Sequence, residues 1–192
     1  AAVFYSISNC QKGLAGVTFG NFLIKQVVEE LARDVPGLRH FVTLSPLPGF
    51  AAWLESEGLP DGLADPHWHR EAERRETLAP ELSAAAARYL VNAKDARGRP
   101  RDPVARFHLG NGASLDRINP FADLSPRGLD ESFGVMVNYR YDQASIERNH
   151  EAYAASGKVA TSAAVRRLAA ATPRVTETRP AQPSKKKTEP RQ

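Results

Sequence analysis

The sequence has very little cysteine and no long apolar run. One cysteine, Cys10, occurs among 192 residues, which excludes an internal disulfide and is typical of a reducing compartment. Cys10 could be a reactive thiol, but an ordinary loop cysteine is the favoured reading. No segment approaches the ~20 apolar residues of a membrane-spanning helix. The chain opens directly into a strand-like segment without a charged leader, so we expect no signal peptide, a cytoplasmic, bacterial protein and no membrane partner.

An excess of acidic residues is also lacking, and the formal net charge is +4. Residues 171–192 contain six basic and two acidic residues, so the other 170 residues carry no net charge. Four prolines with Thr, Gln and Ser between them predict a disordered basic tail over residues 172–192. Lys185-Lys186-Lys187 could touch a polyanion, but a solvated tail is favoured, and we expect no nucleic-acid partner.

The stretch from Gly16 to Phe50 organises the rest of the chain. A strand is expected over Ala2–Ile7, then a glycine-bearing loop, then a helix that Asn21 caps and Pro36-Gly37 stops. A strand over His40–Leu44 follows. Unpaired N–H groups at the start of such a helix, together with the helix dipole, favour a phosphate group.

Ser45 follows the second strand and lies in a turn that Pro46 and Pro48 make rigid. On its own, a serine before proline is most often a simple turn residue. It is not in a Gly-x-Ser-x-Gly elbow, which argues against an α/β-hydrolase. Downstream, Asp102 and Pro103 predict the start of a short helix that ends before Gly110, so His108 is expected in its last turn. A histidine there is by default a packed or surface residue.

The remaining pattern predicts strands and helices around these two residues. Apolar side chains alternate over residues 133–141, with Val135, Val137 and Tyr139 on one side, which predicts a half-buried strand. A further strand is expected over 113–119, helices over 50–57, 78–94, 142–155 and 161–171, and a Pro/Gly loop between 119 and 132. His67 and His69 alternate like metal ligands, but no acidic or cysteine partner stands at metal-site spacing, so we expect no metal.

Five segments in this order resemble one known family, the catalytic domain of malonyl-CoA decarboxylases. They are FYSIS, GLAGVTFGNFLIKQVVEEL, LSPLPGF, DPVARFHLGNGASLDRIN and VMVNYRY, within Val3–Tyr141. The resemblance implies an α/β (α+β) fold, a GCN5-related N-acetyltransferase-like mixed sheet flanked by helices, here N-terminally truncated. It implies a catalytic domain, its C-terminal part, over residues 1–171. Two readings of the missing front half stay open: a fragment of a longer enzyme, or a truncated product without activity.

The resemblance also implies the chemistry and the residues that perform it. The catalytic residues would be Ser45, His108 and Tyr141, acting on malonyl-CoA without a metal or other cofactor and releasing acetyl-CoA and CO2. Ser45 would hydrogen-bond the malonyl carboxylate or His108, or act as a nucleophile, and His108 would protonate the enolate carbon. Tyr141 would help to bind the substrate, although a strand-end aromatic is an equally good reading. The residues expected to bind CoA are Gly16, Val17, Thr18, Phe19, Gly20 and Asn21.

Two positions restrict which residue roles can be transferred from the family to this chain. Animal members have glutamate where this chain has Thr18, so no acid–base role is expected there, and Ser6 is best read as a strand serine. Two other functions stay open: an acyl-CoA-dependent N-acetyltransferase, and a CoA-binding protein without activity. The expected partner is a small acyl-CoA molecule, with self-association into a homo-oligomer favoured more when the family's N-terminal helical domain is present.

Overall fold

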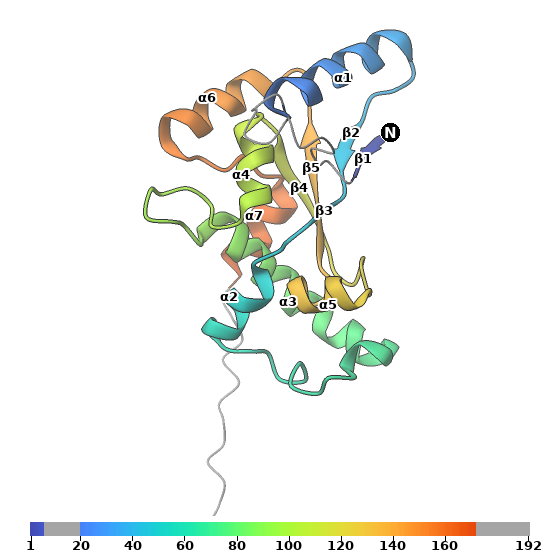
Figure 1. Ribbon diagram of the computed structural model, residues 1–192, viewed down its shortest axis with the longest axis vertical. Coiled ribbons are helices and arrows are strands. Elements are labelled where there is room, and N and C mark those ends of the chain that lie inside the picture. Colours follow the sequence, from blue (N-terminus) through green and yellow to red (C-terminus); the bar gives the residue numbers. More distant parts are fainter. Residues whose placement is uncertain (6–19, 172–192) are drawn as a thin grey trace, which may run out of the picture.

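The computed structural model describes residues 1–5 and 20–171 of the chain. In these residues the strands are β1 Ala2–Phe4, β2 Phe41–Thr43, β3 Ser45–Pro46, β4 Ser114–Asn119 and β5 Met136–Tyr141. The helices are α1 Gly20–Asp34, α2 Phe50–Glu57, α3 Ala72–Asn92, α4 Pro103–Gly110, α5 Pro126–Ser132, α6 Ile146–Ser156 and α7 Ala163–Ala170, with a short 3₁₀ turn, η2, at Trp68–Arg70. Figure 1 shows the strands in the middle of the molecule with helices around them.

The strands form one mixed sheet with β5 at its centre. One side of β5 pairs with β4, and the other side pairs first with β2 and then with β3, all antiparallel. Phe41 faces Tyr141 and Ser45 faces Val137, so β2 and β3 keep one register along β5. β1 adds to the outer edge of β2 in parallel. The expected α/β fold with a mixed sheet flanked by helices is confirmed, and the arrangement agrees with the N-acetyltransferase-like fold.

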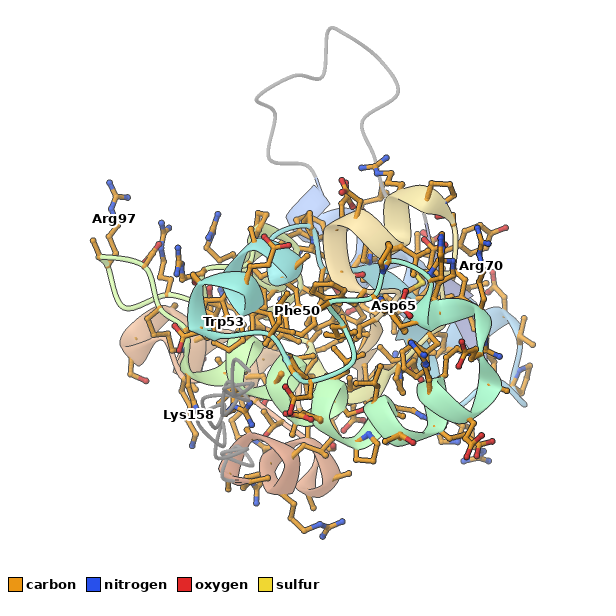
Figure 2. All side chains as sticks on the ribbon, turned by 90° about the horizontal axis from the view of Figure 1, so that it is seen from below. Phe50, Trp53, Asp65, Arg70, Arg97 and Lys158 are labelled. Carbon is orange, nitrogen blue, oxygen red and sulfur yellow. The ribbon has the colours of Figure 1, made fainter. Side chains whose placement is uncertain are left out.

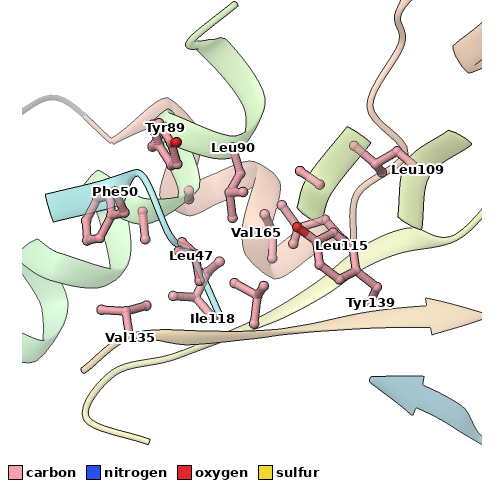
Figure 3. Packing of buried hydrophobic residues seen from close by; sticks show 14 of the residues in the cluster. Leu47, Phe50, Tyr89, Leu90, Leu109, Leu115, Ile118, Val135, Tyr139 and Val165 are labelled. Atoms are coloured by element: carbon pink, nitrogen blue, oxygen red, sulfur yellow. The ribbon is translucent and has the colours of Figure 1, made fainter. Parts of the chain in front are cut away.

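The core lies between the sheet and helices α3 and α7. The alternation expected for β5 is confirmed, because Val135, Val137 and Tyr139 are fully buried and their neighbours face the other side of the sheet. Figure 3 shows Tyr139 and Leu115 from the strands packed near Val165 of α7. Each fully buried Val or Leu side chain stabilises the fold by roughly 1.5–3 kcal/mol relative to an exposed one.

Helix α3 contributes an aromatic contact at the other end of this core. The rings of Phe50 and Trp53 from α2 lie 5.7 and 5.2 Å from the ring of Tyr89 in α3. Figure 2, seen from below, shows Phe50 and Trp53 near the middle of the molecule, whereas Arg97 and Lys158 lie at its outside. Helix α2 is therefore held by its aromatic residues against α3.

The structure differs from the sequence expectations at several element ends. The strand expected over 40–44 is observed as β2, and Ser45-Pro46, expected to lie in a turn that does not pair, forms β3 against β5. Helix α1 begins at Gly20, so Asn21 lies inside its first turn and is not the N-cap. Helix α5 lies in the segment expected to be a loop, where Ser125 caps it by accepting a hydrogen bond from the Gly128 N–H. Short helices of this kind are hidden by their glycine and proline content.

Candidate active site

Ser45 lies directly after the break between β2 and β3, the two short strands that both pair with β5. Between β2 and β3 the backbone of the strand leaves β5, and side chains replace the missing ladder bonds. Thr43 Oγ1 accepts the backbone N–H of Tyr139 at 3.1 Å, and the Asn138 side-chain amide donates to the Thr43 carbonyl. The Leu44 N–H donates instead to the Phe4 carbonyl of β1 at 2.9 Å. The polar side chains that hold this interruption also fix the backbone that carries Ser45.

His108 lies in the last turn of α4, as expected. The carboxylate of Asp102 caps this helix by accepting the Ala105 N–H at 2.7 Å, and Pro103 occupies its first position. At the other end the N–H of Asn111 donates to the carbonyls of Phe107 and His108. The helix is therefore closed at both ends, which holds the imidazole in one place against the sheet.

The structure brings Ser45, His108 and Tyr141 together. Ser45 Oγ lies 3.2 Å from His108 Nε2, and the Tyr141 hydroxyl lies 2.8 Å from His108 Nδ1. These residues come from β3, α4 and β5, and they are 63 and 33 positions apart along the chain. Both ring nitrogens thus have a partner, and the imidazole links the two hydroxyl groups.

Burial sets the protonation state of this group. His108 is 3% exposed, and its ring stacks on that of Tyr139 with the centroids 4.5 Å apart. Because burial disfavours the imidazolium ion, the pKa of His108 is lowered to about 4. Burial likewise raises the pKa of the Tyr141 hydroxyl well above its usual range. At neutral pH the site therefore contains a neutral imidazole between two neutral hydroxyls, which suits proton transfer without a stable charge.

A groove of about 320 Å³ opens at β3 on the face opposite to the Ser45 side chain, since Leu44 and Pro46 line it and Ser45 does not. It is lined by Tyr5 next to β1, by Leu44 and Pro46 on either side of Ser45, and by residues of α5 and β5. In the part of the chain that the structure describes, no strand pairs with the edge of β3 that faces away from β5. The outer edge of β3, the strand that carries Ser45, is therefore unpaired within these residues.

The expected CoA-binding residues are only partly described. Gly16, Val17, Thr18 and Phe19 lie outside the described residues, as do Ser6, Cys10 and the expected tail over 172–192. Gly20 and Asn21 form the start of α1. The roles expected for these residues stay predictions.

Sequence reasoning did not single out Thr43 and had placed Tyr139 only in the core. Thr43 lies two residues before Ser45, and Tyr139 two residues before Tyr141, so each pair shares one face of its strand. This period of two is the signal that could have found them. Thr43 contacts the Ser45 hydroxyl directly, and Tyr139 contacts the imidazole ring.

His67 and His69, whose spacing resembled a metal motif, lie at the short 3₁₀ turn η2. His67 is exposed, and Trp68 between the two histidines is buried in the core. Within residues 1–5 and 20–171, no group of three or more His, Cys, Asp or Glu side chains is arranged to hold a metal ion. Among the helices of these residues, none has both the length and the apolar character needed to cross a bilayer.

The fold and the site define an α/β protein with the groups that acid–base enzymes use, a buried imidazole linked to hydroxyls. A family model described as "Malonyl-CoA decarboxylase C-terminal domain" matches residues 1–179. The chain therefore belongs to the malonyl-CoA decarboxylase family, which confirms the resemblance in its sequence motifs.

Curated relatives and solved structures agree with this assignment. The chain is 39% identical over 184 residues to the mitochondrial malonyl-CoA decarboxylase of Anser anser anser, covering 79% of the chain and 36% of that protein. For the Rattus norvegicus protein of the same name the identity is 38%, covering 88% and 41%. A crystal structure of malonyl-CoA decarboxylase from Rhodopseudomonas palustris is 52% identical with a TM-score of 0.80, covering 86% of this chain and 41% of that one. The structure from Cupriavidus metallidurans is 42% identical with a TM-score of 0.68, covering 86% and 47%.

The chain corresponds to only part of each relative's length. The chain spans about two fifths of the curated relatives that it matches. The reaction of the complete relatives is therefore a proposal for this chain.

Proposed function

We propose that this chain supplies the catalytic residues of an enzyme that converts malonyl-CoA to acetyl-CoA and CO2. The observation that carries the proposal is the 3.2 Å contact between Ser45 Oγ and His108 Nε2. Family membership supports the choice of substrate, because the matching proteins are named malonyl-CoA decarboxylases.

Decarboxylation of a malonyl thioester needs two things from the protein. When the bond to the carboxylate breaks, CO2 leaves and its bonding electrons form an enolate of the acetyl thioester. Hydrogen-bond donors must stabilise the developing oxyanion, and one well-placed donor contributes about 3 kcal/mol. A proton must then be delivered to the enolate carbon, and a positioned acid accelerates such a step by roughly 10²–10⁴.

The neutral state of His108 favours a relay over direct protonation by an imidazolium. Ser45 would give its proton to the enolate carbon while Nε2–H of His108 gives its proton to Ser45. Nδ1 would take the Tyr141 proton in the same step, and Tyr141 would recover a proton from solvent. No stable charge is needed on the imidazole, which agrees with a pKa lowered to about 4 by burial. The same low basicity supports Ser45 as a hydrogen-bond and proton donor, not as a nucleophile activated by His108.

The groove at β3 would hold the arm of CoA, and the acyl group would reach the Ser45 side chain past the unpaired edge of β3. Tyr5, Leu44 and Pro46 line it where β1 has ended and β3 continues alone along β5. The nucleotide end of CoA would bind residues 16–21, since the start of the 15-residue helix α1 presents N–H groups and a positive dipole to a pyrophosphate. No metal or organic cofactor is part of this proposal.

The experiment is to incubate the purified protein with malonyl-CoA and to measure acetyl-CoA and CO2. We expect turnover in the wild-type protein. We expect it also in the control variant His67→Gln, because His67 is exposed and is not one of the proposed catalytic residues. Ser45→Ala and His108→Gln should each lower kcat by roughly 10²–10⁴, with circular dichroism showing that both variants are folded.

The other outcomes are equally informative. Binding of malonyl-CoA without release of CO2 would contradict the proposal and favour an inactive CoA-binding protein. Transfer of an acetyl group to an amine, unaffected by His108→Gln, would favour an N-acetyltransferase. We expect self-association into a homo-oligomer less of this chain than of a protein that also has the family's N-terminal helical domain, and light scattering on both proteins measures it.

A further inference from the structure

The ladder between β5 and the strands β2 and β3 skips one position. β2 and β3 keep one register along β5 in which Thr43 would face Tyr139, but the two residues do not form a ladder pair. In an ordinary antiparallel ladder the Tyr139 N–H would donate to the Thr43 carbonyl. It donates instead to the threonine side chain, to Oγ1 at 3.1 Å. Because a backbone N–H can only donate, the direction of this bond is fixed.

The Thr43 carbonyl is held by Asn138, the residue before Tyr139. A carbonyl oxygen can only accept, so the Asn138 atom that meets it must be the amide Nδ2. Oδ1 of Asn138 in turn accepts from Asn119 Nδ2 of β4 at 2.8 Å. Side-chain amides thus connect β4 through β5 to the backbone of β2, and one backbone carbonyl fixes the orientation of both amides.

Asn138 and Tyr139 reach Thr43 on opposite faces of the sheet. Successive side chains of a strand alternate between its faces, so Asn138 lies on the face away from the His108 ring, on which the Tyr139 ring stacks. Because the amide holds the Thr43 carbonyl, the Tyr139 N–H is left to the threonine hydroxyl. That hydroxyl lies 2.8 Å from Ser45 Oγ, whichever of the two hydroxyls donates.

We propose that Asn138 is a positioning residue for Ser45, acting through Thr43 from the other face of the sheet. By taking the Thr43 carbonyl out of the ladder, it directs the threonine hydroxyl to the Tyr139 N–H and so places it beside Ser45. The 3.2 Å contact between Ser45 Oγ and His108 Nε2 depends on this placement. The placement does not depend on the reaction, and only its effect on turnover rests on the proposed function.

The alternative is that the Thr43 hydroxyl displaces the carbonyl from the ladder by itself. Asn138 would then only supply a donor to a carbonyl that is already free. The two cases differ in what happens when the amide is removed. If Asn138 is the cause, the Thr43 carbonyl returns to the ladder and accepts the Tyr139 N–H. If the hydroxyl is the cause, the ladder stays broken.

The test compares Asn138→Leu with the control Asn119→Leu by NMR spectroscopy of the protein without substrate. Leucine branches at the same carbon as asparagine but donates no hydrogen bond. A scalar coupling across the hydrogen bond, from amide nitrogen to carbonyl carbon, detects a backbone pair directly. We expect no coupling between Tyr139 and the Thr43 carbonyl in wild type and in Asn119→Leu, and a coupling in Asn138→Leu. Because Asn138 is only partly buried, Asn138→Ala replaces the leucine variant if that variant does not fold.

Two results would overturn the proposal. One is this coupling in the wild-type protein, which needs no variant. The other is a folded Asn138→Leu or Asn138→Ala protein in which the coupling is still absent. In turnover assays we expect Asn138→Leu to lose about 10- to 100-fold in kcat with little change in KM, and Asn119→Leu to stay within about threefold of wild type. A wild-type protein that lacks the coupling, as expected, but does not release CO2 from malonyl-CoA would contradict the proposed function alone.

Discussion

Replacing Asp102 by asparagine should change how the stability of this protein depends on pH. One carboxylate oxygen of Asp102 caps α4, whereas the other, Oδ2, is buried without a hydrogen-bond partner in the part of the chain that the structure describes. The cap and the helix dipole favour the charged form, but burial outweighs them and raises the pKa of Asp102 from 3.8 to about 6. Since each pKa unit corresponds to about 1.4 kcal/mol, this difference amounts to about 3 kcal/mol.

The sign of this pH dependence is set by whether the folded or the unfolded state binds the Asp102 proton more tightly. Between pH 3.8 and about 6 the folded protein keeps a proton on Asp102 that the unfolded chain has lost. The contribution of Asp102 to the free energy of unfolding is therefore largest at low pH and is lost as the pH rises through this range. His108 acts in the opposite direction, because burial lowers its pKa to about 4 and its contribution is lost as the pH falls below about 6.5.

The difference between Asp102→Asn and the wild-type protein isolates the first of these effects. Asparagine keeps the cap and cannot ionise. We expect the free energy of unfolding of the variant, relative to wild type, to rise by about 2 kcal/mol from pH 4 to pH 8. Urea titrations at several pH values, followed by tryptophan fluorescence, measure it. Asp61→Asn, at an exposed loop carboxylate, is the control. A difference that does not vary with pH would refute the reasoning.

Two further predictions concern the turn after α4 and the far side of the imidazole. Gly112→Ala should destabilise the fold by more than about 3 kcal/mol. The reason is that Gly112 has φ +80° and an added Cβ would lie 2.2 Å from the Ile146 carbonyl oxygen. The control Gly110→Ala, whose Cβ would meet nothing closer than 3.8 Å, should leave the melting temperature nearly unchanged. Tyr141→Phe removes the hydroxyl at His108 Nδ1 and should lower kcat for malonyl-CoA at least about 10-fold with KM little changed. Equal kcat values for Tyr141→Phe and wild type would exclude the relay.

Several local features could be read from the sequence because their causes are local. Asp102 and Pro103 mark the start of α4 by capping chemistry alone, and the observed cap is the expected one. The alternation over β5 reflects one buried and one partly exposed face of the sheet. The pairing of Ser45-Pro46 with β5 after a break at Leu44 was not expected, because it depends on the Asn138 side chain, which donates to the Thr43 carbonyl, and on the Thr43 hydroxyl, which accepts the Tyr139 N–H.

The motifs of the chain were sufficient to indicate its family, and through the family to name Ser45, His108 and Tyr141. They could not show that these side chains touch, since contacts between residues 63 and 33 positions apart depend on the register of β5 and on how α4 packs against it. The neutral state of His108 is likewise a property of the folded protein, because burial lowers the pKa of its imidazole. Residue types along the chain specify which groups are available, whereas packing determines which atoms meet and which of them carry protons.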